Sequence, residues 1–94
     1  MYVDDFIWLP DIVEKLAAKH NVTEHEVEEV FFNRPHFRFL ETGYRSGEDV
    51  YGVLGQTDGG RYLIVFFIYK PDRLALILSA RDMDEKERRR YEQR

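Results

Sequence analysis

Six basic or aromatic side chains are the strongest candidates for chemistry in this 94-residue sequence. They are Lys19, His20, Arg61, Arg81, Arg88 and Tyr91. Side chains of these types can cleave RNA to a 2′,3′-cyclic phosphate without a metal. That reaction needs a base near the 2′-OH, cations beside the phosphate and an acid at the leaving oxygen. In this hypothesis Arg81 steadies the phosphate and His20 or Lys19 assists proton transfer, while an aromatic ring such as Tyr91 stacks on a base or donates a proton.

Each candidate also has a structural interpretation that needs no substrate. His20 ends an expected helix, where the helix dipole favours its positive form. Arg61 could simply start a strand beside a turn, and Arg81 could form an ion pair with Glu87 or Asp84. Arg88, Arg89 and Arg90 point in different directions on a helix, so at most one or two can face a site. The spacing of the candidates along the chain leaves both interpretations open.

Other kinds of chemistry have weaker support. The three histidines, His20, His25 and His36, have no helical i,i+4 spacing, and no cysteine is present to complete a zinc site. Ser79 lacks the G-x-S-x-G pattern of a serine nucleophile. The glycines of "GVLGQTDGGR" belong to an expected hairpin rather than to a phosphate-binding loop between a strand and a helix. We therefore expect no metal and no cofactor.

Composition predicts a single small domain over residues 1–94. The absence of cysteine fits a reducing cytoplasm. The longest apolar run, "YLIVFFIY", has eight residues, far short of the roughly 20 needed to span a membrane. The net charge of −4 divides into −7 over residues 1–60 and +3 over residues 61–94. This distribution argues against a general nucleic-acid coat but permits a local basic face, or a basic face that a partner covers.

The first third of the chain predicts a short strand and two helices. Tyr2–Trp8 mixes β-branched and aromatic residues and should form the strand. Pro10 suits the first turn of a helix over residues 10–20, with Asn21 as its left-handed cap. Thr23 opens a second helix with the capping-box pattern, and this helix should stop before Pro35.

The remainder predicts a sheet and a last helix. Strands are expected at 36–41, 50–56, 61–70 and 73–81, with a tight turn at 57–60 and apolar residues on both faces of 61–70. Capping boxes at Asp82–Glu85 or Asp84–Glu87 could begin the last helix. Met83 and Tyr91 lie about two turns apart, so we expect both to dock on the sheet. The predicted fold is α+β, with an antiparallel four- to five-stranded sheet and the helices packed against one face.

Four stretches of the sequence resemble the BrnT toxin family. The ending "LSARDMDEKERRRYE" is similar to the family's "I-S-A-R" strand followed by "E-R-x-x-Y". The stretch "LGQTDGGRYLIVFF" resembles its "G-x-x-x-x-G-R-x-L-x-V" hairpin. "FIWLP…KHNV" and "VEEVFFN" resemble its N-terminal helices. The matches span nearly the whole chain in the right order.

The resemblance implies a RelE-like fold and a ribonuclease toxin of a bacterial type II toxin–antitoxin pair. Its partners would be an RNA substrate and a BrnA-like antitoxin with a DNA-binding ribbon-helix-helix domain, and a homodimer is possible. The sequence departs from the family pattern where it has Leu9, Ile12, Leu16, Asn21, Val50 and Leu76. At three of these positions, Ile12, Val50 and Leu76, the family pattern has a positively charged residue. The second hypothesis is therefore a catalytically silent interaction module with the same fold.

Overall fold

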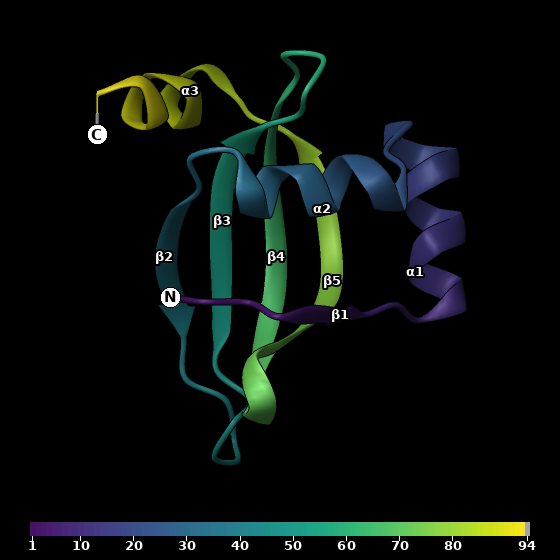
Figure 1. Ribbon diagram of the computed structural model, residues 1–94, viewed down its shortest axis with the longest axis vertical. Helices are drawn as coiled ribbons and strands as arrows, with labels where there is room; N and C mark the ends of the chain where they lie inside the picture. The colour runs from purple at the N-terminus through teal and green to yellow at the C-terminus, as the bar shows by residue number, and fades with distance from the viewer. Residues whose placement is uncertain (94) are drawn as a thin grey trace.

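A computed structural model describes residues 1–93, with five strands in one mixed sheet and helices on both of its faces (Figure 1). The strands are β1 (Asp5–Ile7), β2 (His36–Glu41), β3 (Val50–Gln56), β4 (Tyr62–Lys70) and β5 (Leu74–Asp82). The helices are α1 (Pro10–Lys15), its π-helical continuation η1 (Leu16–His20), α2 (Glu24–Phe32), the 3-10 turn η2 (Pro71–Arg73) and α3 (Glu85–Glu92).

The helical boundaries follow local sequence signals. Pro10 occupies the first turn of α1, and Asn21 adopts the left-handed conformation at φ 52° after η1. Thr23 and Glu26 form the predicted capping box of α2. The expected first helix is continuous but changes its hydrogen bonding from α to π at Leu16. The expected N-terminal strand is shorter than predicted, because only Asp5–Ile7 pairs with β5.

The sheet has the order β1-β5-β4-β3-β2. β2 to β5 form the predicted antiparallel meander, but β1 pairs with β5 in parallel. The prediction of an antiparallel sheet was therefore wrong for this strand. Tight turns force neighbouring strands to be antiparallel, whereas most of the chain separates β1 from β5 and no turn fixes its direction. Phe6 of β1 is held instead by packing, with its ring 5.0 Å from that of Phe31.

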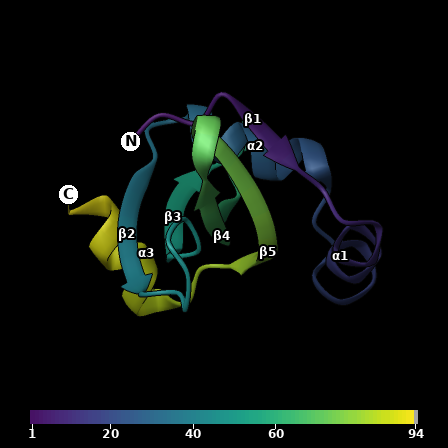
Figure 2. The same ribbon diagram turned by 90° about the horizontal axis from the view of Figure 1, so that it is seen from below.

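The two faces of the sheet bury different clusters. The larger core joins α2 and η1 to inward residues of β3, β4 and β5. It includes Val30 of α2 and Val65 and Phe67 of β4. On the opposite face, Tyr91 of α3 packs with Leu54 and Ile64. The expectation of helices on one face is wrong for α3, which lies on the other side from α2 (Figure 2). The apolar residues on both sides of β4 explain this, because each face needs its own cover.

α3 is held by its cap and by one buried ring. The capping box that forms is Asp84–Glu87, while Asp82 remains in β5. Tyr91 is 4% exposed and is the buried residue of α3, with Met83 packed beside the same cluster. The prediction that Met83 and Tyr91 dock on the sheet is confirmed.

Candidate functional site

The sheet separates the six candidate residues into two groups. Arg81 pairs with Ile64, whose side chain lies on the α3 face of the sheet, so the Arg81 side chain lies on that face too. The next residue, Asp82, pairs with Leu63 and lies on the α2 face. The side of the sheet that α1 and α2 cover holds Lys19, His20 and Arg61. The side that α3 covers holds Arg81, Arg88 and Tyr91.

A β-bulge in β5 produces this division. Phe66 pairs with Ser79 and Phe67 with Ile77, so Leu78 is an extra residue. Ala75 and Ile77 are buried on the α2 face before the bulge, and Ala80 is buried there after it. Strict alternation from Ile77 would send Arg81 to the α2 face, whereas the bulge shifts the register and sends it to the α3 face.

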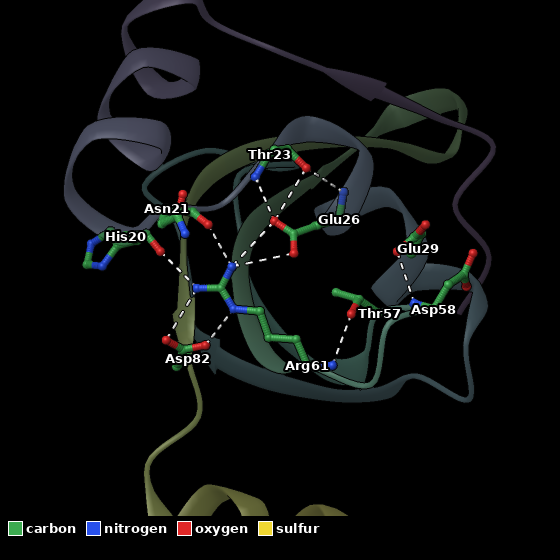
Figure 3. A network of polar contacts seen from close by, with 9 residues as sticks. All are labelled: His20, Asn21, Thr23, Glu26, Glu29, Thr57, Asp58, Arg61 and Asp82. Atoms are coloured by element: carbon green, nitrogen blue, oxygen red, sulfur yellow. Dashed lines mark hydrogen bonds and ion pairs between the residues drawn. The ribbon is translucent and has the colours of Figure 1, made fainter.

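Arg61 uses all five of its N–H donors inside the protein (Figure 3). Its Nε and Nη2 donate to the carboxylate of Asp82 at 2.8 and 3.3 Å. Nη1 donates to the carbonyl of Asn21 at 2.6 Å and to Glu26 at 3.4 Å, and Nη2 also donates to the carbonyl of His20 at 2.8 Å. No donor remains for a phosphate in this arrangement.

The Arg61 network joins three elements that are distant in sequence. It caps the end of η1, contacts the capping box of α2 and anchors the end of β5. The hydrogen bond from Arg61 lowers the pKa of the Asp82 carboxyl, so the pair is charged at neutral pH. This geometry favours the structural interpretation of Arg61.

His20 and Lys19 contribute little to this network through their side chains. The His20 ring points away from the guanidinium, and only its backbone carbonyl is bonded to Arg61 (Figure 3). Lys19 lines a shallow hollow on α1 and η1 beside Asp11, Glu14 and Lys15. Neither side chain meets the candidates on the other face.

The turn at 57–60 is tied to α2 beside this network. Thr57 Oγ1 accepts from the backbone N–H of Arg61 at 3.0 Å, and the backbone N–H of Asp58 donates to Glu29 at 3.0 Å (Figure 3). The side-chain amide of Asn33 donates to Asp58 at 2.7 Å, and this bond lowers the pKa of Asp58. These contacts hold the hairpin against the helix.

Arg81 forms a bidentate pair with Glu87 on the α3 face. Nη1 and Nη2 donate to the two carboxylate oxygens at 2.8 and 2.9 Å, and Nη1 also donates to the carbonyl of Asp82 at 3.1 Å. The predicted ion pair with Glu87 is thus present. These bonds use three of five donors, and within residues 1–93 two N–H groups have no acceptor, one of them Nε. The guanidinium lies 5.5 Å from the centre of the half-buried Phe66 ring.

Glu87 is ionised by its surroundings. The hydrogen bond from Arg81 is the main cause that lowers its pKa, followed by the backbone N–H of Asp84; the charges of Arg81 and Arg38 add to this. Arg38 lies on β2 opposite Gly52, two residues after His36, so both point to the α3 face. The sequence patterns did not place Arg38, His36 or Glu87 among the candidates, although all three lie on this face. The alternation in "HFRFLE" pairs His36 with Arg38, but their meeting with α3 required the strand order.

Arg88 and Tyr91 serve mainly to position α3. The Arg88 guanidinium stacks over the Tyr62 ring at 4.0 Å and lies 3.8 Å from Glu92. The buried Tyr91 hydroxyl donates to the carbonyls of Arg34 at 3.1 Å and Asn33 at 3.4 Å. A ring that is 4% exposed offers no surface on which a base could stack.

Residues 8–87 match a family model described as the ribonuclease toxin BrnT of a type II toxin–antitoxin system. The chain belongs to the BrnT family. Membership makes it a toxin of a type II pair, and a BrnT toxin implies an antitoxin partner. A comparison with curated proteins gave no match.

The BrnT match runs from Trp8 to Glu87 and includes Arg38, Arg61 and Arg81. Arg88 and Tyr91 lie just beyond it. Within residues 1–93, no three metal-binding side chains are grouped as ligands. No helix in the described part of the chain is long and apolar enough to cross a bilayer.

Proposed function

We propose that this BrnT protein is a metal-independent endoribonuclease whose cleavage site lies on the α3 face, at Arg81, Glu87 and Arg38. The observation that carries the proposal is the Arg81–Glu87 pair, which places an ionised carboxylate beside a guanidinium with two unused donors. A base and a phosphate-binding cation are what cleavage at a 2′-OH requires.

In the proposed reaction, the Glu87 carboxylate takes the proton of the 2′-OH. The 2′ oxygen attacks the phosphorus, and the bond from phosphorus to the 5′ oxygen breaks. Arg81 and Arg38 stabilise the negative charge that grows on the phosphoryl oxygens. We assign protonated His36, on the same face of β2, to donate a proton to the leaving 5′ oxygen. The products are a 2′,3′-cyclic phosphate and a 5′-hydroxyl.

This proposal keeps Arg81 from the sequence-based set and changes the roles of the others. Arg61 has no donor left for a substrate, and Tyr91 is buried under α3. Lys19 and His20 lie across the sheet from Arg81. We propose that Arg61 and Tyr91 act by fixing β5 and α3 in place.

The proposed partner is a BrnA-like antitoxin with a ribbon-helix-helix domain, acting with the toxin in the cytoplasm. A type II pairing supports the existence of an antitoxin. The ribbon-helix-helix type comes from the motif resemblance, and the location from the absence of cysteine. A short reading frame with the ribbon-helix-helix pattern beside the toxin gene would support this partner, and co-purification of the two proteins tests it.

Cleavage of a defined single-stranded RNA in the presence of EDTA tests the activity. Arg81→Ala should lower the cleavage rate by roughly 10² to 10³, the usual loss when one charge-stabilising donor is removed. Glu87→Gln should lower it by about 10² or more, because Gln preserves the capping box but accepts no proton. Arg45→Ala, in the exposed 42–49 loop, is the control and should cleave normally.

The enzyme proposal fails if the purified wild type leaves RNA intact and its expression does not slow growth. Circular dichroism of each variant separates a lost reaction from a lost fold. Growth arrest that Arg81→Ala abolishes would support the proposal in cells.

A second candidate is a silent module that only binds its partner. Val50, Ile68 and Leu76 pair in register across β3, β4 and β5, and they form an apolar row on the α3 face. The family resemblance would place cations at Val50 and Leu76, so this row favours protein contact over RNA contact. Harmless expression together with a stable antitoxin complex would identify this candidate as the function.

A further inference from the structure

A groove of about 550 Å³ separates α3 from the start of β2. It is lined by His36, Lys86, Arg89, Arg90 and Gln93. Lys86, Arg89 and Arg90 of α3, with Gln93 that caps its end, follow the i, i+3, i+4, i+7 spacing and therefore form one stripe of the helix. Three of these four carry a positive charge, and the fourth side chain is an amide.

α3 sorts its charges by face, although the helix is nearly neutral overall. Glu87 points to Arg81 at 2.8 Å, and Glu92 lies against Arg88 and the Tyr62 hydroxyl. The exception is Glu85, which stands 3.9 Å from Arg89, but its side chain is 95% exposed and such a pair is weak. Among residues 1–93, neither Lys86 nor Arg90 has a carboxylate within 4.0 Å.

The groove adjoins the proposed cleavage site along β2. His36 lines the groove, and Arg38 follows on the same face of β2. On the other wall, Lys86 precedes Glu87 in α3. A chain of phosphates that reaches Arg81 and Arg38 would therefore meet Lys86, Arg89 and Arg90 next.

We infer that this groove binds the phosphates of the RNA strand that flank the cleaved bond. The inference rests on the proposed ribonuclease function and adds a substrate-binding tract to it. Exposed cations at a fixed spacing bind a polyanion by releasing its counterions, without any base contact. The groove would therefore raise affinity for single-stranded RNA without selecting a sequence.

RNA fits this groove better than an acidic protein segment does. Protein interfaces take most of their energy from a few hot-spot residues, chiefly Trp, Tyr and Arg, that are packed in desolvated pockets, whereas the groove arginine Arg89 is 64% exposed. Among residues 1–93, no Phe, Tyr, Trp or aliphatic side chain lines the groove, and the large exposed apolar residues, such as Phe32, Phe39 and Tyr44, are not among its lining residues. A lining of flexible basic side chains without apolar anchors suits the negative charges of a phosphate backbone.

Fluorescence anisotropy with a labelled, single-stranded 2′-O-methyl oligonucleotide tests the inference. This probe lacks the 2′-OH, so binding is measured without cleavage. Arg89→Gln with Arg90→Gln should lower the affinity by roughly tenfold near 0.1 M salt. The slope of log K against log salt, between about 50 and 200 mM KCl, should become shallower by about 1.4, at about 0.7 per phosphate contact.

The matched control is Lys15→Gln with Arg45→Gln, which removes the same charge from exposed positions outside the groove. This control should bind like the wild type. Equal affinity and salt slope for the groove variant and the wild type would overturn the inference while leaving cleavage at Arg81 untouched. A groove variant that loses affinity for polyglutamate but not for the oligonucleotide would also overturn it, in favour of an acidic protein partner.

The cleavage assay keeps the two proposals apart. If the groove variant binds the oligonucleotide poorly and wild type never cleaves RNA, the groove stands as a polyanion site and the enzyme proposal fails. If the variant cleaves slowly only at low RNA concentration, both proposals are supported, because binding is lost and chemistry is not.

Discussion

Arg61 and Arg81 are the same residue type at the ends of neighbouring strands, yet their hydrogen bonds differ. Arg61 donates to two backbone carbonyls and two carboxylates, and every donor is used. Arg81 donates to one carboxylate and one carbonyl, and two donors remain. A guanidinium can contact a phosphate only through donors that are free, so of these two arginines Arg81 is the one with donors available for a phosphate.

Replacing Arg61 should therefore reduce stability rather than change the chemistry directly. Arg61→Ala is expected to lower the free energy of unfolding by about 2 kcal/mol, since charge-assisted hydrogen bonds to three elements are lost. Arg61→Lys should recover little, because an ammonium cannot reproduce the planar fork. Urea unfolding measures both, with Arg45→Ala expected within about 0.5 kcal/mol of wild type. An Arg61→Ala variant as stable as the wild type would contradict the structural role.

Glu87 predicts a pH dependence of stability. Its pKa is lowered in the folded state, so its contribution is present above the unfolded value of about 4.3 and is lost as pH falls through the folded pKa. At pH 7, Glu87→Gln should be less stable than wild type by about 1–2 kcal/mol. The difference should shrink as the pH is lowered below about 4. Urea titrations over that range check this, and a gap that is constant with pH would show that the ion pair does not stabilise the fold.

At the scale of elements, the backbones of α2 and β3 approach each other closely, and this contact sets the position of α2 on the sheet. Gly55 of β3 faces the helix, and a Cβ there would stand 2.8 Å from the carbonyl oxygen of Val30 and 2.9 Å from its Cγ1. These distances are shorter than real Cβ contacts, so the helix would have to move away. The position of α2 also sets Glu26, which contacts Arg61, and Glu29, which contacts the 57–60 turn.

Gly55→Ala should thus destabilise the protein by about 1–3 kcal/mol, the usual cost of overpacking a core contact. Gly59→Ala is the matched control, because its Cβ would meet only the Thr57 hydroxyl at 3.8 Å. That control should stay within about 0.5 kcal/mol of wild type. Thermal or urea unfolding followed by circular dichroism compares the two, and equal stabilities would refute the close approach of α2.

At the scale of the whole molecule, one sheet is shared by two cores. The α2 core includes Phe6 from β1, and Trp8 packs against it while its indole N–H donates to Glu28 at 3.0 Å. The α3 cluster rests on the other side of β3 and β4 through Leu54 and Ile64. Neither helical layer has a sheet of its own, so loss of the sheet removes the support of both.

We therefore expect a single cooperative unfolding transition. Trp8 fluorescence reports the α2 core, and far-UV circular dichroism reports the helices and strands of the whole chain. Their urea midpoints should coincide, as for a two-state domain of this size. Separate midpoints would show that the N-terminal segment unfolds independently of the sheet.

The sequence by itself determined the local elements. Capping patterns at Thr23 and Asp84, the left-handed Asn21 and the alternation at 36–41 all depend on neighbours within a few residues. These local rules hold whatever the rest of the chain does, which is why the strand and helix order was predicted well. The family motifs were also readable, and the BrnT match confirms them.

Only the tertiary structure decided which side chains meet. The direction of β1 depends on packing rather than on a turn, and α3 covers the face that α2 leaves open. The extra residue at Leu78 reverses the alternation of β5 and moves Arg81 away from Arg61. Such register shifts arise from long-range pairing, which no local pattern encodes. For this reason the sequence indicated Arg81 and its possible ion pair with Glu87, whereas the nearness of Arg38 to this pair emerged only from the folded sheet.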